Sequence, residues 1–275
     1  MRSTAGIASH LAVAGLAFAA GLAIPLALRQ RATQALHVAS HARSHATTHG
    51  EWVWIHRGAD SLRAYVGYPE RRDKAPAVIV IHEIFGLTDW EPTMVDSLAA
   101  KGFVAIVPDL LSSKYGHSPS DPDSGVKLVS GLDPAAVTAD LNAAYDYVNA
   151  LPAVRKDDIG VIGFCWGGTQ SFRYATNNPK LKAAVICYGQ TPDSAALARI
   201  QAPLLGVYGE SDARISLTVP ATDSMLRQLG KSYRYTIYPG TGHGFLKPGR
   251  KGYDTPSRAR AWADVLAFFH TNLEK

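Results

Sequence analysis

Three side chains that can together carry out nucleophilic catalysis stand in the segments GFCWGG, GESD and GTGHGF. They are Cys165, Asp212 and His243. A cysteine thiolate can attack a carbonyl carbon, a histidine can move protons to and from the reacting atoms, and a carboxylate can orient the histidine ring. These residues therefore predict acyl transfer through a thioester.

Each of the three residues, taken alone, also has an ordinary structural explanation. Cys165 can be a buried cysteine in a glycine-rich turn, Asp212 a turn or cap residue, and His243 a loop histidine with local hydrogen bonds. Glu210 is a second, weaker candidate for the acid. We favour catalysis because the order nucleophile, acid, histidine is that of the α/β-hydrolases, and because each residue follows a predicted strand.

The elements that must position these residues are short apolar strands. The strands are predicted at 159–163 before Cys165, 204–208 before Asp212, and 233–238 before His243. A helix is expected to begin near Trp166, so that a sharp strand-to-helix turn lifts the Cys165 sulfur above the sheet. The positive end of that helix dipole favours a thiolate.

Strands and helices alternate along the rest of the chain from residue 51. Further strands are predicted at 51–56, 62–68, 77–82, 103–107 and 183–188, the first two joined as a hairpin. Helices are predicted at about 89–101, from 133 to about 148, and from 255 onward. This alternation favours a mostly parallel sheet of about eight strands with helices on both faces. The expected fold is that of the α/β-hydrolases, with reactive groups at the carboxyl ends of the strands.

A fourth segment, HEIFG, follows the strand predicted at 77–82. In α/β-hydrolases the loop at this position supplies one donor of the oxyanion hole. We therefore expect the backbone N–H groups of Ile84 and Trp166 to bind the oxyanion. Without further context, Glu83 is better explained as an ordinary exposed loop residue.

HEIFG, GFCWGG, the strand-end Asp212 and GTGHGF, in this order, resemble the dienelactone hydrolases, also called carboxymethylenebutenolidases. The resemblance covers residue 51 to the C-terminus. It implies hydrolysis of a small-molecule ester or lactone without a metal or organic cofactor. It also implies that Glu83 takes the proton of Cys165 as substrate binds. His243 then stabilises the thiolate and protonates the leaving enolate, while Asp212 orients the imidazole ring.

The expected substrate contacts depart from the pattern of that family. Its dienelactone-cleaving members hold a substrate carboxylate with two arginines, one after a strand ending in Pro-Asp-Leu and one after the catalytic histidine. In this chain Lys114 and Lys247 occupy these regions, and Arg214 and Arg250 are possible substitutes. A lysine presents a point charge, whereas an arginine can bind a carboxylate with two parallel hydrogen bonds. The resemblance therefore implies the type of reaction but not the identity of the substrate. Segment 111–130 is expected at the pocket rim.

Two other functions remain open on the sequence. The chain can be a general carboxylesterase or thioesterase, or a membrane-tethered binding module that has lost turnover. The intact set of four motifs argues against the binding module. In either enzyme we expect a monomer.

The charge distribution argues against nucleic-acid binding. The net charge is +5, but residues 1–50 hold four arginines and no acidic residue. Residues 51–275 therefore carry 24 basic and 23 acidic side chains. A domain so nearly neutral has no electrostatic footprint for nucleic acid.

The N-terminal residues are expected to lie outside the catalytic domain at 51–275. An uncharged apolar run at 11–28 predicts either a signal peptide within residues 1–35 or an uncleaved membrane anchor. Both place the domain outside the cytoplasm, in the periplasm or secreted, and only the anchor involves a membrane.

Residues 36–50 are expected to form a polar linker. A histidine recurs there at every fourth position: His37, His41, His45 and His49. A helix would align these rings for a divalent metal, but no carboxylate or cysteine supports such a site. The second cysteine, Cys187, is expected in a buried strand, and a bridge to Cys165 would remove the nucleophile. We therefore expect no metal and no disulfide in the active protein.

Overall fold

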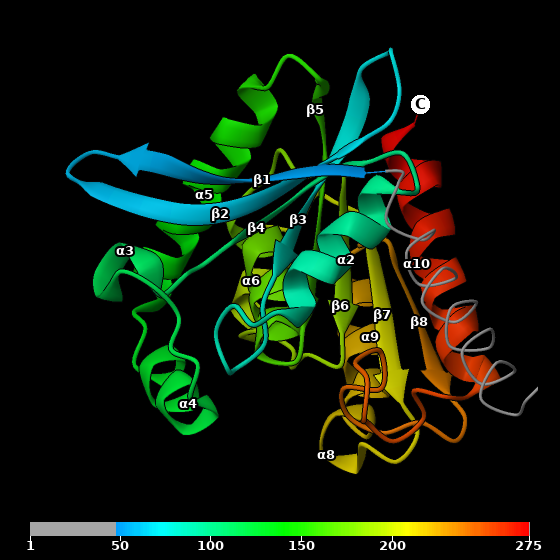
Figure 1. Ribbon diagram of the computed structural model, residues 1–275. Helices are drawn as coiled ribbons and strands as arrows, with labels where there is room; N and C mark the ends of the chain where they lie inside the picture. The colour runs from blue at the N-terminus through cyan, green and yellow to red at the C-terminus, as the bar shows by residue number, and fades with distance from the viewer. Residues whose placement is uncertain (1–47, 275) are drawn as a thin grey trace, which may run out of the picture. The chain divides into compact units, whose positions relative to one another are not determined.

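An eight-stranded sheet runs through residues 48–274, the part of the chain that the computed structural model describes (Figure 1). Its order is β1-β2-β4-β3-β5-β6-β7-β8. The strands are β1 (Thr48–Arg57), β2 (Asp60–Pro69), β3 (Ala75–Ile81), β4 (Val104–Pro108), β5 (Val154–Phe164), β6 (Ala183–Cys187), β7 (Leu204–Gly209) and β8 (Tyr233–Tyr238). All neighbours from β4 to β8 are parallel, whereas β1 and β2 form an antiparallel hairpin and β2 pairs antiparallel with β4. The predicted mostly parallel sheet of about eight strands is confirmed.

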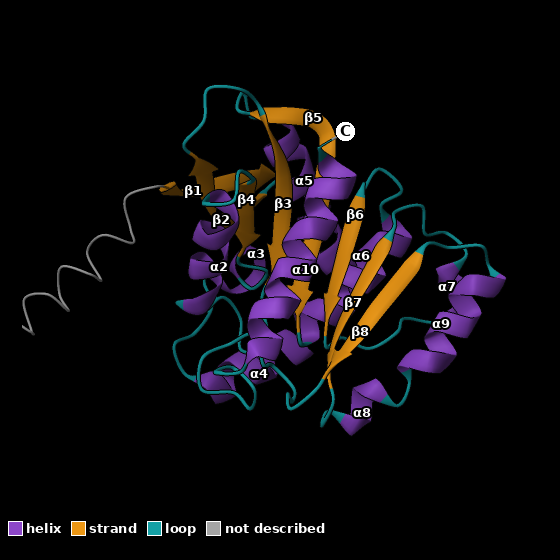
Figure 2. Ribbon diagram, turned by 90° about the vertical axis from the view of Figure 1, so that its right-hand side faces the viewer, coloured by secondary structure: helices purple, strands orange, loops and turns teal. Residues whose placement is uncertain are grey.

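Helices cover both faces of this sheet (Figure 2). They are α2 (Trp90–Ala99), α3 (Ser112–Tyr115), α4 (Pro122–Ser130), α5 (Pro134–Ala150), α6 (Trp166–Asn177), α7 (Ser194–Leu197), α8 (Ala213–Ser216), α9 (Val219–Gln228) and α10 (Pro256–Leu273). Helices α5 and α6 contribute to the core on one face, and α2 and α10 to the core on the other. Figures 1 and 2 show the same division.

Strand β3 illustrates why the central strands read as unbroken apolar runs. All seven of its residues are buried. Ile79 belongs to the core beneath α5 and α6, whereas Val78 and Val80 belong to the core beneath α2 and α10. Because successive side chains of a strand point to opposite faces, a strand covered on both faces needs apolar residues at every position.

Several predicted boundaries shift, and five helices had no predicted range: α3, α4, α7, α8 and α9. Strand β1 begins at Thr48 rather than at residue 51, and β5 begins at Val154 rather than 159. Segment 111–130 contains α3 and α4, where Asp121 caps α4 through the Ser124 N–H. Asp133 caps α5 as expected, accepting from the Ala135 N–H at 3.2 Å.

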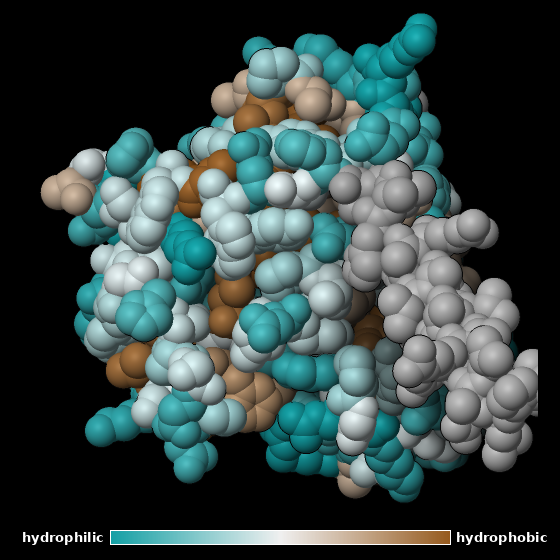
Figure 3. All heavy atoms as spheres, in the orientation of Figure 1, coloured by the Kyte–Doolittle hydropathy of each residue, from teal (hydrophilic) through white to brown (hydrophobic). Residues whose placement is uncertain are grey.

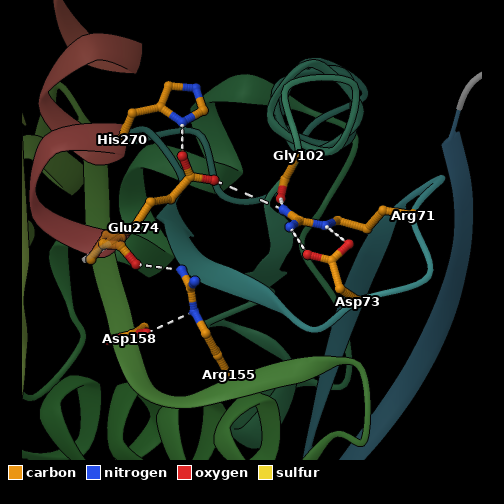
Figure 4. Close-up of polar contacts among 8 residues, drawn as sticks. Arg71, Asp73, Gly102, Arg155, Asp158, His270 and Glu274 are labelled. Atoms are coloured by element: carbon orange, nitrogen blue, oxygen red, sulfur yellow. Dashed lines mark hydrogen bonds and ion pairs between the residues drawn. The ribbon is translucent and has the colours of Figure 1, made fainter.

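A polar cluster ties the end of α10 to the segment that leads into β3 and to the start of β5 (Figure 4). Arg71 pairs with Asp73 and lies 3.8 Å from Glu274, while Arg155 donates to the Leu273 carbonyl at 2.6 Å. His270, one turn earlier on α10, contacts Glu274 at 2.7 Å. These contacts fix the C-terminal helix against the sheet.

The hydrophilic side chains dominate the face of the molecule in Figure 3, where apolar residues appear only as scattered patches. The large apolar side chains lie mainly in the two cores. Trp52 and Trp54 on the edge strand β1 are exceptions, with exposed fractions of 44% and 53%.

The predicted signal peptide or anchor lies outside the described residues, as do His37, His41 and His45. His49 lies in β1, in extended backbone, with its ring 6.3 Å from that of Tyr68. Among residues 48–274, no helix is long and apolar enough to cross a membrane. The same residues contain no group of three or more His, Cys, Asp or Glu side chains that could hold a metal ion.

Candidate active site

Cys165 occupies a sharp turn between β5 and α6. Its backbone has φ 57° and ψ −116°, and a positive φ is uncommon for a residue with a side chain. The turn depends on the flanking glycines, because a Cβ at Gly163 would overlap the Gly167 carbonyl. A Cβ at Gly167 would overlap the carbonyls of Ile81 and His82. The glycines of GFCWGG thus make room for a strained turn, and the thiol of Cys165 lies at this turn.

The loops after β7 and β8 bring Asp212 and His243 to the same edge of the sheet. Ser211 ties these loops together by donating its N–H and its hydroxyl to the Thr241 carbonyl, at 2.9 and 2.8 Å. His243 Nδ1 then lies 2.6 Å from Asp212 Oδ2. Glu210 is exposed and instead accepts from the Gly240 N–H at 3.0 Å. Asp212, not Glu210, is therefore the carboxylate that contacts the imidazole.

The pKa of His243 reflects both of its neighbours. Burial lowers this pKa, but hydrogen bonds and charge interactions with Cys165 and Asp212 outweigh burial and raise it to about 9. Because Nδ1 is taken by Asp212, Nε2 is the ring nitrogen available to the sulfur. The imidazole keeps its proton at neutral pH, next to a thiol that it can stabilise as a thiolate.

A cavity of about 270 Å³ opens beside these groups. Its lining combines the thiol, the imidazole, both expected oxyanion donors and one cation: Ile84, Cys165, Trp166, Thr169, Tyr188, Gln190, Arg214, Ile215 and His243. The N–H groups of Ile84 and Trp166 donate to no acceptor within residues 48–274. Two larger cavities lie elsewhere in the described chain, but neither is lined by Cys165, Asp212 or His243. The chemistry therefore singles out the smaller cavity.

Glu83 is buried and paired, rather than exposed. Its carboxylate lies 2.7 Å from the ammonium of Lys247, and the two side chains have exposed fractions of 3% and 18%. Lys247 also lies over the rings of Phe85 and Trp90, at 5.5 and 5.0 Å from their centroids. Within the described residues no hydrogen bond joins Glu83 to Cys165. Lys247 was expected to contact the substrate, but in the structure it pairs with the Glu83 carboxylate in the loop after β3.

A buried carboxylate holds this loop at its far end. Glu91, fully buried at the start of α2, accepts from the Thr88 N–H at 2.8 Å and from the Thr88 hydroxyl at 2.6 Å. It also accepts from the Glu83 N–H at 3.4 Å. Glu91 was not predicted to belong to the site, although Thr88 and Glu91 match T-x-x-E, the pattern of a helix capping box.

His82 and Trp166 form a second contact of the same loop that the sequence did not reveal. His82 is fully buried, and its Nδ1 lies 2.8 Å from the Glu83 carbonyl oxygen. Its ring stacks on Trp166, with centroids 5.4 Å apart and planes at 15°. The residue before the glutamate is therefore part of the wall behind the cavity.

The remaining expected contacts divide between cavity and surface. Arg214 lines the cavity from α8. Lys114 does not, and its ammonium lies 5.1 Å from the centroid of the Tyr115 ring on α3. Segment 111–130 contributes no residue to this cavity, contrary to its expected place at the rim. The reason is that α4 packs on the HEIFG loop, where a Cβ at Gly125 would overlap the Phe85 carbonyl.

Strand β6 adds the residues behind the thiol. Cys187 is fully buried, and both cysteines are free thiols. Burial raises the pKa of Cys187 well above its usual value, so this thiol stays protonated at neutral pH. The next residue, Tyr188, has φ 42° and packs its ring edge-on to His243, with centroids 5.1 Å apart. Its buried hydroxyl has no partner among the described residues.

Comparison with known proteins gives a consistent family. A sequence profile described as "Dienelactone hydrolase family" matches residues 62–273. "Putative carboxymethylenebutenolidase" of Salmonella typhimurium is 32% identical over 225 residues, covering 76% of this chain and 83% of that protein. "Probable 2-oxo-3-(5-oxofuran-2-ylidene)propanoate lactonase" of Bradyrhizobium is 31% identical over 235 residues, covering 81% and 94%.

Solved structures support the same fold. "Putative Dienelactone Hydrolase" from Klebsiella pneumoniae superposes with a TM-score of 0.74 at 30% identity, covering 81% of this chain and 98% of that one. The acylaminoacyl peptidase of Pyrococcus horikoshii superposes with a TM-score of 0.68 at 17% identity, covering 86% and 44%. The second likeness concerns the fold alone.

Proposed function

This chain belongs to the dienelactone hydrolase family, and we propose that it hydrolyses a small lactone or carboxylic ester through a thioester formed on Cys165. That it is a carboxymethylenebutenolidase-like hydrolase follows from the family. The assignment of the reacting residues is the proposal. One observation carries it: the imidazole of His243, held 2.6 Å from Asp212, and the thiol of Cys165 at the sharp turn line the same cavity.

The first step is the loss of the thiol proton. With the pKa of His243 raised by Cys165 and Asp212, we take a carboxylate rather than the imidazole as the acceptor of the Cys165 proton. Glu83 is the carboxylate that fits this role, as its loop also carries the oxyanion donor Ile84. In the resting state Lys247 holds Glu83. An anionic substrate that draws Lys247 away frees Glu83 to act as the base, and the His243 imidazolium then stabilises the thiolate.

The second step is attack on the carbonyl. The sulfur forms a C–S bond, and the carbonyl oxygen becomes an oxyanion that the Ile84 and Trp166 N–H groups can bind. Such donors are worth about 10²–10³ in rate each. As the C–O bond to the leaving group breaks, His243 gives its proton to the departing enolate or alkoxide. Neutral His243 then takes a proton from water, whose oxygen bonds to the acyl carbon as the C–S bond breaks and the acid is released. The departing thiolate takes back the proton held by Glu83, and Glu83 pairs with Lys247 again.

The size and charge of the cavity limit the substrate. A volume of about 270 Å³ suits a small ester. Arg214 is a cation of the lining, and it suits a substrate that carries a carboxylate. A neutral ester is the second candidate, because neither Lys114 nor Lys247 lines the cavity. Such a substrate cannot draw Lys247 away, so Glu83 would then have to separate from Lys247 without the help of a substrate charge.

Export from the cytoplasm and a monomeric state are part of the same proposal. The apolar run at 11–28 supports export. N-terminal sequencing of the mature protein separates a cleaved signal peptide from a retained anchor, and an unprocessed protein in the cytoplasm would contradict both. A molecular mass above that of one chain in light scattering would contradict the monomer.

The decisive experiment replaces the proposed nucleophile. Cys165→Ser should remove most activity against a panel of dienelactone, p-nitrophenyl esters and acyl thioesters, because Glu83 and His243 are arranged for a thiol. Cys187→Ala is the matched control, since Cys187 lies in the core and should leave turnover near that of the wild type. Wild-type hydrolysis by Cys165→Ser would show that the nucleophile is wrong.

A further inference from the structure

We infer that His82 is a positioning residue of the oxyanion hole: its ring holds the Glu83–Ile84 peptide so that the Ile84 N–H points at the reacting carbonyl. This inference rests on the proposed function of the Cys165 site and deepens it. No part of it depends on which ester is hydrolysed.

The hydrogen bond to Glu83 determines which nitrogen of His82 carries the proton. A carbonyl oxygen can only accept, so Nδ1, at 2.8 Å, must donate. The other nitrogen, Nε2, is buried and has no partner among the described residues. A buried ring with one unsatisfied nitrogen is costly compared with an apolar side chain of similar size. The bond from Nδ1 is the one polar contact that explains a histidine at this place.

The geometry of the peptide transmits this bond to the cavity. The Glu83 carbonyl and the Ile84 N–H belong to one planar peptide unit, and in a trans unit they point in opposite directions. A donor that holds the oxygen from behind therefore aims the N–H to the front, where Ile84 lines the cavity. The Gly86 N–H contacts the same oxygen at 3.3 Å, which is a weaker restraint.

His82 also contacts the second donor. Its ring lies 5.4 Å from that of Trp166, almost parallel, and the Trp166 N–H is the other half of the expected oxyanion hole. The backbones of His82 and Gly167 are also in close contact, because a Cβ at Gly167 would overlap the His82 carbonyl. One buried side chain thus contacts both segments, the loop after β3 and the start of α6, whose N–H groups must converge on one oxygen.

The test compares two amides at this position. In His82→Asn the side-chain nitrogen lies close to the position of Nδ1 and can donate to the Glu83 carbonyl. In His82→Gln the amide lies one bond further along, where Nε2 was, and in His82→Leu there is no donor. We expect kcat for ester hydrolysis to fall about 10²-fold in the Leu and Gln variants, with KM changed by less than about threefold. The Asn variant should recover at least tenfold of that loss.

A second readout separates positioning from a general structural role. Alkylation of Cys165 by iodoacetamide needs the thiolate but no oxyanion hole, so its rate should be the same in all three variants and in the wild type. A kcat loss with unchanged alkylation supports the inference. Equal kcat in the Asn and Gln variants, or alkylation that falls in parallel with kcat, would overturn it. Should the Leu variant not fold, the Asn and Gln pair still decides the matter.

The proposed function can fail separately. Wild-type activity in Cys165→Ser would contradict the assignment of Cys165 as the nucleophile. The His82 variants instead test the oxyanion donors in an enzyme whose thiol is intact. An unaltered kcat in His82→Leu together with an inactive Cys165→Ser would leave the thioester mechanism standing and reject the role of His82.

Discussion

The carboxylate of Glu83 lies 2.7 Å from the ammonium of Lys247, although 164 residues separate them in the chain. The pair joins the loop after β3, which carries Ile84, to the loop after β8, which carries His243. Both partners are largely buried, and two aromatic rings face the ammonium. In the proposed mechanism, this pair engages the carboxylate that later acts as the base.

Removal of Lys247 alone should destabilise the protein. Lys247→Met leaves the Glu83 carboxylate buried without its partner, and breaking such a pair costs about 3–5 kcal/mol. The partial exposure of Lys247 places the expected loss in the free energy of unfolding at the lower end, and urea titration measures it. Glu83→Gln combined with Lys247→Met should recover most of the loss, because both charges are then gone. Losses that simply add in the double variant would mean that the two side chains are not coupled.

The pH dependence of turnover should follow His243. Its pKa is raised to about 9, and in the proposed mechanism the protonated ring stabilises the thiolate and protonates the leaving group. Turnover should therefore hold at neutral pH and fall as the pH rises through about 9. Asp212→Asn removes one of the two groups that raise this pKa, so the alkaline fall in turnover should move to lower pH. In the same variant kcat should decrease by up to about 10⁴-fold. An alkaline fall at the same pH in that variant would contradict the assignment of Asp212.

The turn at Cys165 should not tolerate a methyl group at Gly167. Gly167→Ala forces a Cβ against two carbonyls, and overpacking of this kind typically costs about 1–3 kcal/mol. Gly131, at the end of α4, is the matched control, because its φ is −92° and a Cβ there would meet its nearest neighbours at 3.6 Å. Gly131→Ala should change the free energy of unfolding by less than about 0.5 kcal/mol. Equal stability of the two variants in urea would show that the turn is less tightly packed than described.

The charge of the substrate should be read by Arg214 and not by Lys114. Arg214→Gln should raise KM for a carboxylate-bearing ester about tenfold or more, and leave KM for a neutral p-nitrophenyl ester almost unchanged. Lys114→Gln should alter neither value, because this side chain lies outside the cavity. If Lys114→Gln raised KM for the anionic ester alone, segment 111–130 would have to contact the substrate after all.

Much of this architecture is local in origin and could be predicted from the chain alone. Short continuous apolar runs rich in valine and isoleucine, such as β3, favour strands buried on both faces, and Asp133-Pro134 is typical of a helix start. The glycines around Cys165 likewise specify a turn through their missing Cβ atoms, without reference to distant residues. The rule that parallel strands present their carboxyl ends at one edge also predicted that Cys165, Asp212 and His243 lie at the same edge of the sheet.

The pairing of side chains across that edge could not be predicted in the same way. Whether Asp212 or Glu210 meets His243 depends on which side chain points inward from one loop, and both sit within two residues of each other. The partner of Glu83, the place of Lys114 and the contact of His82 depend on directions set by elements far away in the chain. Apolar residues recur every two positions in a strand and about every 3.6 positions in a helix, so a short stretch of sequence is enough to predict these elements. The direction of one buried side chain, in contrast, depends on all the atoms that pack around it.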